Sequence, residues 1–73
     1  MSEEMKRLLD FLDTIEKLIK RRKKDYYSEI DRYIGVSIEM FRKLDISEQY
    51  QTISRVYDIV NQYKTKYNAK YIR

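Results

Sequence analysis

Apolar side chains in the first part of the chain recur at alternating spacings of three and four residues, as on one face of an amphipathic helix. These residues are Met5, Leu8, Leu12, Ile15 and Ile19. Ser2 stands in the N-cap position, and two glutamates follow it in the first turn, where the helix dipole favours negative charge. The pattern predicts a helix over residues 3–21.

The same period continues in the next segment and predicts a second helix over residues 25–44. Its members are Tyr27, Ile30, Ile34, Ile38 and Phe41. Gly35 weakens this helix, and residues 36–40 alternate apolar and polar positions as a strand would. A strand at 36–40, exchanged across a dimer, is therefore the alternative. If the segment is helical, Gly35 indicates the close approach of a neighbouring backbone.

A capping box marks the start of the third segment, because Asp45 precedes Glu48 by three residues and a renewed apolar period follows. The period predicts a helix over 46–68 whose core positions are Ile46, Tyr50, Ile53, Tyr57, Val60 and Tyr67. Val56, Ile59 and Tyr63 lie beside this stripe. Residues 69–73 are expected to form a frayed end or a docking tail.

The composition of the chain indicates a fold built from these three helices. The chain has 73 residues, no proline and one glycine, so almost nothing interrupts a helix. The prediction is one all-α domain over residues 1–73, a small antiparallel three-helix bundle. Because a core of this size supplies only a few kcal/mol, self-association or docking on a partner is expected.

The residues between the first two helices leave an alternative open. Nothing in "KRRKKD" forbids a helix, so residues 3–44 could form one continuous rod. In a continuous helix, like charges in this run that are three or four residues apart would repel one another. Asp25 can instead cap a new helix. A break at residues 21–25 is the favoured interpretation.

The chain lacks the residue types that most catalytic sites use. It contains no histidine and no cysteine, which excludes Ser-His and Cys-His nucleophiles, imidazole or thiolate metal sites and disulfides. Asp10, Asp13 and Glu16 follow one another on the first helix, but Lys17 and Lys20 stand one turn beyond two of them, which favours a solvated face. We expect no enzyme, cofactor, metal or small-molecule substrate.

Positive charge gathers in two short segments. Residues 17–24 carry six bases and residues 64–73 carry four, with no acid in either, whereas the net charge of the whole chain is only +4. In an up-down-up bundle these segments share one end, which predicts a basic, tyrosine-rich pole. Cations attract phosphates and tyrosine rings stack on unpaired bases, so this pole is a candidate nucleic-acid site. Its residues are Lys20, Arg21, Arg22, Lys23, Lys24, Tyr26, Tyr27, Lys64, Lys66, Lys70, Tyr71 and Arg73.

Two function classes remain. One is a small non-catalytic accessory protein that docks on itself or on a larger assembly, including one that handles nucleic acid. Its candidate interface consists of Phe11, Leu18, Val56, Ile59 and Tyr63. The other is an accessory or regulatory protein that binds DNA or RNA directly through the basic pole. No apolar run is long enough to span a membrane, and acid-base pairs on the first helix argue against surface insertion. A cytoplasmic protein is expected, with a thermophile-like composition rich in Lys and Glu.

Overall fold

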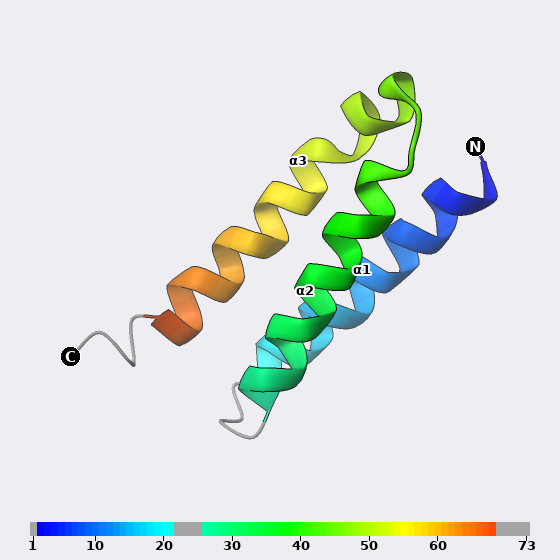
Figure 1. Ribbon diagram of the computed structural model, residues 1–73. Coiled ribbons are helices and arrows are strands. Elements are labelled where there is room, and N and C mark those ends of the chain that lie inside the picture. Colours follow the sequence, from blue (N-terminus) through cyan, green and yellow to red (C-terminus); the bar gives the residue numbers. More distant parts are fainter. Residues whose placement is uncertain (1, 22–25, 69–73) are drawn as a thin grey trace.

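Three helices pack side by side in the structure, a computed structural model that describes residues 2–21 and 26–68 (Figure 1). They are α1 (Glu3–Arg21), α2 (Tyr27–Arg42) and α3 (Ile46–Tyr63), and a π-helical turn, η2 (Lys64–Asn68), continues α3. All three helices contact one another, and neighbours along the chain run in opposite directions. The predicted all-α three-helix bundle is confirmed.

The ends of the helices follow local capping chemistry. The backbone N–H of Met5 donates to Ser2 Oγ at 3.2 Å, and the backbone N–H of Glu48 donates to Asp45 Oδ1 at 2.9 Å. Both predicted caps are therefore present. α1 ends at Arg21 and α2 begins at Tyr27 alongside it, so a single helix over 3–44 is wrong. The expected Asp25 cap lies outside the described residues, as does the predicted tail at 69–73.

α1 supplies the largest share of the core. Its predicted stripe is confirmed, since all five members are buried: Met5, Leu8, Leu12, Ile15 and Ile19. The same cluster takes Ile30 and Ile34 from α2 and Leu44 from the turn that follows it. Because the stripe of α1 is wide, it contacts both other helices, and half-buried Leu9, Phe11 and Leu18 extend its apolar face.

Residues 36–40 belong to α2, so the strand alternative is wrong. Ser37 rather than Ile38 faces the core, and its hydroxyl donates to the backbone oxygen of Ile34 at 2.7 Å. Gly35 is exposed, and a Cβ added there would have no heavy atom within 4 Å apart from its chain neighbours and the backbone of its own helix. The expectation that Gly35 admits a neighbouring backbone is therefore not met within the described part of the chain.

α3 is rotated relative to the sequence prediction. Its buried residues are Thr52, Val56, Ile59 and Tyr63. Four members of the predicted core stripe are exposed instead, namely Ile46 at 72%, Tyr50 at 78%, Ile53 at 45% and Tyr57 at 65%. Each of Ile53 and Tyr57 follows a buried residue by one position, which is a turn of about 100° around the helix. Two stripes with the same period run along α3, and the more apolar one faces outward.

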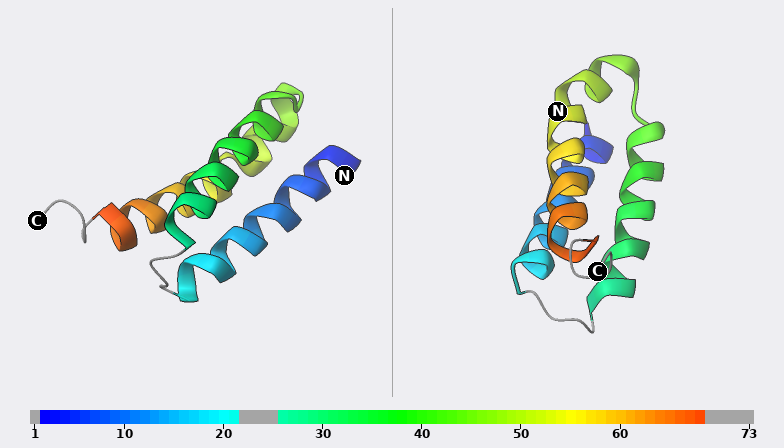
Figure 2. Two further views of the ribbon diagram at one scale, coloured as in Figure 1. Left: turned by 60° about the horizontal axis from the view of Figure 1, so that its bottom comes forward. Right: turned by 90° about the vertical axis from the view of Figure 1, so that its left-hand side faces the viewer.

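The bundle is elongated, measuring 40 × 17 × 16 Å. Its two ends differ in the elements they hold. The start of α1 and the α2–α3 turn lie at one end, and the ends of α1 and α3 lie at the other (Figures 1 and 2). No helix within the described residues is long and apolar enough to cross a membrane.

The Gly35→Ala variant is expected to be more stable than the wild type. Glycine inside a helix is about 1 kcal/mol less favourable than alanine, and the open space around Gly35 means that the added methyl group meets no obstacle. Urea denaturation followed by circular dichroism should show a free energy of unfolding raised by roughly 0.5 to 1 kcal/mol. An unchanged or lower value would show that this position needs glycine.

Candidate functional site

The basic pole combines the last turn of α1 with the end of α3. Lys20 and Arg21 are exposed at the end of α1, and Lys64 and Lys66 lie in η2. Figure 2 shows the two helix ends at the same end of the bundle. None of these four side chains has a carboxylate within ion-pair distance in the part of the chain that the structure describes. The other predicted cations, and Tyr71, lie outside the described residues: Arg22, Lys23, Lys24, Lys70, Tyr71 and Arg73.

The tyrosines at this pole are part of the bundle rather than free rings. The ring centroids of Tyr27 and Tyr63 lie 5.7 Å apart, and the Tyr63 hydroxyl donates to Asp31 Oδ1 at 3.1 Å. Burial raises the pKa of Tyr63 well above its usual value, and the neighbouring Tyr27 hydroxyl and the Asp31 carboxylate raise it further. Tyr26 is half-buried against the core. The pole therefore presents cations, while its aromatic rings join α2 to α3.

Much of the predicted protein interface is internal. Val56, Ile59 and Tyr63 belong to the buried core, with exposed fractions of 6%, 0% and 7%. They cannot form a free surface, because α3 turns this side toward the other two helices. Phe11 and Leu18 are half-buried, and the Phe11 ring packs edge-on against Tyr33 with centroids 5.6 Å apart. Phe11 thus joins α1 to α2.

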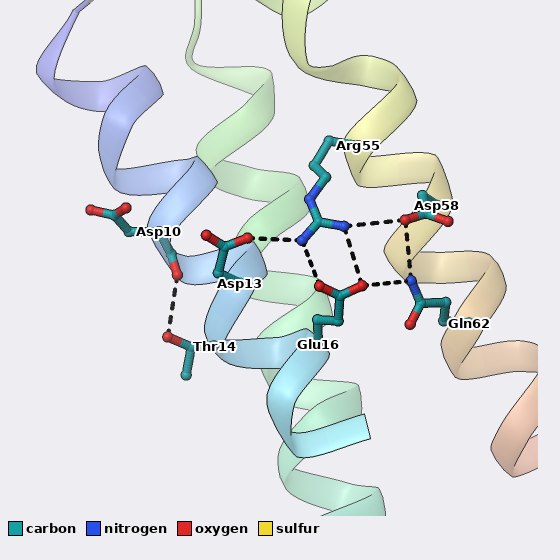
Figure 3. Close-up of polar contacts among 7 residues, drawn as sticks. All are labelled: Asp10, Asp13, Thr14, Glu16, Arg55, Asp58 and Gln62. Carbon is teal, nitrogen blue, oxygen red and sulfur yellow. Dashed lines mark hydrogen bonds and ion pairs between the residues drawn. The ribbon is translucent and has the colours of Figure 1, made fainter. Parts of the chain in front are cut away.

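An arginine cluster joins α1 to α3, and sequence reasoning missed it (Figure 3). Arg55 Nη2 lies 2.8 Å from Asp13 Oδ1 and 2.9 Å from Glu16 Oε1, and Nη1 lies 3.1 Å from Asp58 Oδ2. Gln62 Nε2 donates to Glu16 Oε2 at 3.0 Å and to Asp58 Oδ2 at 3.1 Å. The guanidinium fork suits this arrangement, because its planar donors can bond two carboxylates at once.

The cluster is partly shielded from water, and its hydrogen bonds lower the pKa of the glutamate. The exposed fractions of the Arg55 and Glu16 side chains are 27% and 23%. Hydrogen bonds from Arg55, and then from Gln62, lower the pKa of Glu16 from its usual 4.5 to about 2, against the opposing effect of burial. The expected partners Lys17 and Lys20 make no ion pair with Asp13 or Glu16, because Arg55 from α3 occupies these carboxylates.

Acidic residues do not assemble into a metal site within residues 2–21 and 26–68. The three acids considered on α1 have separate surroundings. Asp13 and Glu16 contact Arg55, whereas Asp10 is exposed and its backbone oxygen accepts a hydrogen bond from Thr14 Oγ1 at 3.2 Å (Figure 3). In this structure Asp13 and Glu16 connect α1 to α3, and Asp10 does not.

The outward stripe of α3 holds four of the six large apolar side chains that are exposed in the described part of the chain. Ile46, Tyr50, Ile53 and Tyr57 follow one another at spacings of four, three and four, so they lie along one side of the helix. A surface groove of about 210 Å³ adjoins the first part of this stripe, and its lining is Phe41, Ile46, Gln49, Tyr50 and Ile53. Gln49 Nε2 donates to the backbone oxygen of Phe41 at 3.2 Å, which connects α3 to the end of α2 beneath the groove.

Comparison with known proteins identifies no relative: no family model, no curated protein and no solved structure matches this chain. Two surfaces of the bundle are candidates for a functional site. They are the basic pole and the apolar α2–α3 face, which we define as Ile38 with Ile46, Tyr50, Ile53 and Tyr57 and the adjoining groove.

Replacing Arg55 by methionine is expected to lower the free energy of unfolding at pH 7 by about 1 to 2 kcal/mol, because Glu16 then loses the fork that holds it and stays partly shielded from water. The folded pKa of Glu16 lies below its unfolded value, so this stabilisation is present above pH 4.5 and is lost as the pH falls toward 2. Chemical denaturation of wild type and variant from pH 7 to pH 2 should show the gap closing over that range.

The matched control is Arg42→Met, since Arg42 forms a 3.4 Å pair with Glu39 in which both side chains are more than 60% exposed. An exposed pair of this kind contributes little to stability. If Arg55→Met costs no more than Arg42→Met, or if the gap persists at pH 2, the proposed role of the cluster is wrong.

Proposed function

We propose that this protein is a small non-catalytic interaction module that docks on another protein chain through its apolar α2–α3 face. The observation that carries the proposal is the exposure of Ile46, Tyr50, Ile53 and Tyr57 along a single line of α3. Scattered apolar residues are ordinary on protein surfaces, whereas a contiguous apolar patch beside a groove is typical of an interaction site.

The composition of the face supports docking by protein rather than by a charged ligand. Tyrosine is enriched at the centres of protein interfaces, where its ring is buried and its hydroxyl finds a partner. None of the five side chains that define the face is charged, and Tyr50 and Tyr57 are among its most exposed members. A groove between two helices also suits the apolar side of a helix from the partner.

Replacing Tyr50 and Tyr57 together by serine should abolish docking without unfolding the bundle, because both side chains are largely exposed. The full chain and its variants, tagged and expressed in the natural host, would be purified under native conditions. We expect the wild type to retain one protein in stoichiometric amount and the double variant to lose it.

The matched control is Val36→Ser. Val36 is 45% exposed, but it precedes Ile38 by two residues and so lies about 200° around α2, away from the face. This variant should retain the same protein as the wild type. The proposal is contradicted if the double variant copurifies with the same protein, or if the wild type copurifies with no other protein and is also monomeric.

A second candidate function, direct binding of DNA or RNA, rests on the basic pole. Lys20, Arg21 and Lys64 are exposed there, Lys66 is half-buried, and none of the four forms an ion pair with a carboxylate in the described residues. Cations of this kind bind phosphates without sequence preference and with a steep dependence on salt. With Tyr27 and Tyr63 packed in the bundle, phosphate contact rather than base stacking would carry the affinity.

Alanine at Lys20, Arg21, Lys64 and Lys66 is expected to weaken binding to a labelled single-stranded oligonucleotide, measured by fluorescence anisotropy between 50 and 200 mM salt as approximate limits. Each lost phosphate contact should lower the slope of log K against log salt by about 0.7. The control variant carries alanine at Lys6 and Arg7, which are exposed near the other end of α1. Equal binding by both variants, or no binding by the wild type at low salt, would exclude this function.

A further inference from the structure

The apolar α2–α3 face turns away from α1, which leaves it open to a partner. Arg55 contacts Asp13 and Glu16 on α1, so its side of α3 faces that helix. Tyr57 follows Arg55 by two residues and therefore points about 200° away. On α2, Ile38 is 39% exposed and precedes the groove residue Phe41 by three positions, which puts it on the same side of that helix. The two helices thus share one outward apolar surface.

This face has a hollow at one end and a projecting ring at the other. The groove lies beside the start of α3, between Phe41 and Ile46, and its volume of about 210 Å³ is several times the ~30 Å³ share of one water molecule. Tyr57 lies beyond the groove, one turn past Ile53, and 65% of its surface is exposed. Because the groove and the projecting ring lie on the same side of α3, the ring of one copy can fit the groove of a second copy.

The spacing of these two features suits a two-fold axis. Gln49 in the groove and Tyr57 are each four residues from Ile53, so they lie about 6 Å to either side of it along the helix. Rotating a copy by 180° about an axis through Ile53 and perpendicular to α3 brings the Tyr57 of each copy over the groove of the other. Such an axis makes the same patch serve both partners, which is the rule for isologous dimers.

We infer that the partner of this face is a second copy of this chain, an inference that rests on the proposed docking function. The two α3 helices are antiparallel, and each Tyr57 ring lies in the groove of the other copy. Ile53 then packs against its own counterpart at the centre of the interface. Ile46 and Tyr50 of each copy surround the incoming ring.

The charge of the basic pole favours the antiparallel orientation of the two α3 helices. Lys20, Arg21, Lys64 and Lys66 gather at one end of the bundle, while the other end mixes acids and bases. A parallel dimer would bring two basic poles together, and like charges at close range repel. The antiparallel dimer separates the poles and brings Lys64 of one copy toward the turn that holds Asp45 of the other, because Lys64 and Asp45 lie on opposite sides of Ile53.

The face supplies more than half of the area that such a dimer needs. From their exposed fractions, Ile38, Ile46, Tyr50, Ile53 and Tyr57 present on the order of 500 Å² of apolar surface. A standard interface buries about 800 Å² on each partner, and the polar rim supplies a substantial part of it. The total surface of the described chain is 5389 Å², so a dimer of this kind buries a modest share of it.

Sedimentation equilibrium of the purified full chain tests the inference. We expect a reversible dimer for the wild type and for Val36→Ser. Tyr57→Phe should also dimerise, because the ring that fills the groove remains. Tyr57→Ser should raise the dimer Kd by about 100-fold, since each dimer loses two buried tyrosines at roughly tenfold each. Circular dichroism verifies that each variant is folded, as expected for a change at an exposed site.

Chemical cross-linking tests the orientation, and the absence of native cysteine makes single thiols simple to introduce. Ser47 and Asn61 are exposed and lie on opposite sides of Ile53. In the antiparallel dimer, two Ser47→Cys copies are separated by about 18 Å along the helix, whereas Ser47→Cys of one copy lies level with Asn61→Cys of the other. A short thiol cross-linker should therefore join the mixed pair and leave Ser47→Cys alone unlinked.

The possible results separate this inference from the proposed function. A monomeric wild type, a dimer unaffected by Tyr57→Ser, or efficient linking of Ser47→Cys to itself would overturn the antiparallel self-dimer. If the monomeric chain still retains a different host protein that the Tyr50 and Tyr57 double variant loses, the docking function stands and only the identity of the partner is wrong. If neither experiment shows binding at this face, both proposals fail.

Discussion

The contact between Arg55 and the two acids of α1 is the constraint on which the arrangement of α3 depends. Its guanidinium group bonds Asp13 and Glu16 within 3 Å and so fixes which side of α3 faces α1. Val56 and Ile59 then enter the core, and Tyr57 faces outward. Turning α3 by about 100° to bury the more apolar stripe would draw Arg55 away from both carboxylates and leave Glu16 partly buried without its partner.

This rotation buries Thr52, a small polar residue of α3, and leaves large apolar residues of the same helix outside the bundle. Ser37 and Thr52 are almost completely buried, and each hydroxyl donates to a backbone oxygen of its own helix, at 2.7 Å and 2.9 Å. Burial of a hydroxyl costs little when its hydrogen bond is made. The apolar side chains of the outward stripe have no such role within one copy of the chain, and they gain most from a partner that covers them.

Burial separates four tyrosines of the described residues into two pairs with different roles. Tyr27 and Tyr63 pack against one another and, through Asp31, join the start of α2 to the end of α3. Tyr50 and Tyr57 are exposed along the middle of α3. The proposed docking surface and the basic pole are therefore separate regions of the molecule, and variants can test them one at a time.

The sequence by itself determined the elements of this fold. The period of three and four, the caps at Ser2 and Asp45 and the absence of proline are local features, and they predicted three helices, their approximate bounds and the buried stripe of α1. The rotation of α3, the Arg55 cluster and the apolar α2–α3 face were decided only by tertiary structure. The stripe from Thr52 to Tyr63 and the stripe from Ile46 to Tyr57 have the same period. Hydrophobicity alone favours burial of the second stripe. The observed choice goes with contacts between residues far apart in the chain, Arg55 with Glu16 and Tyr63 with Asp31, which no local pattern reveals.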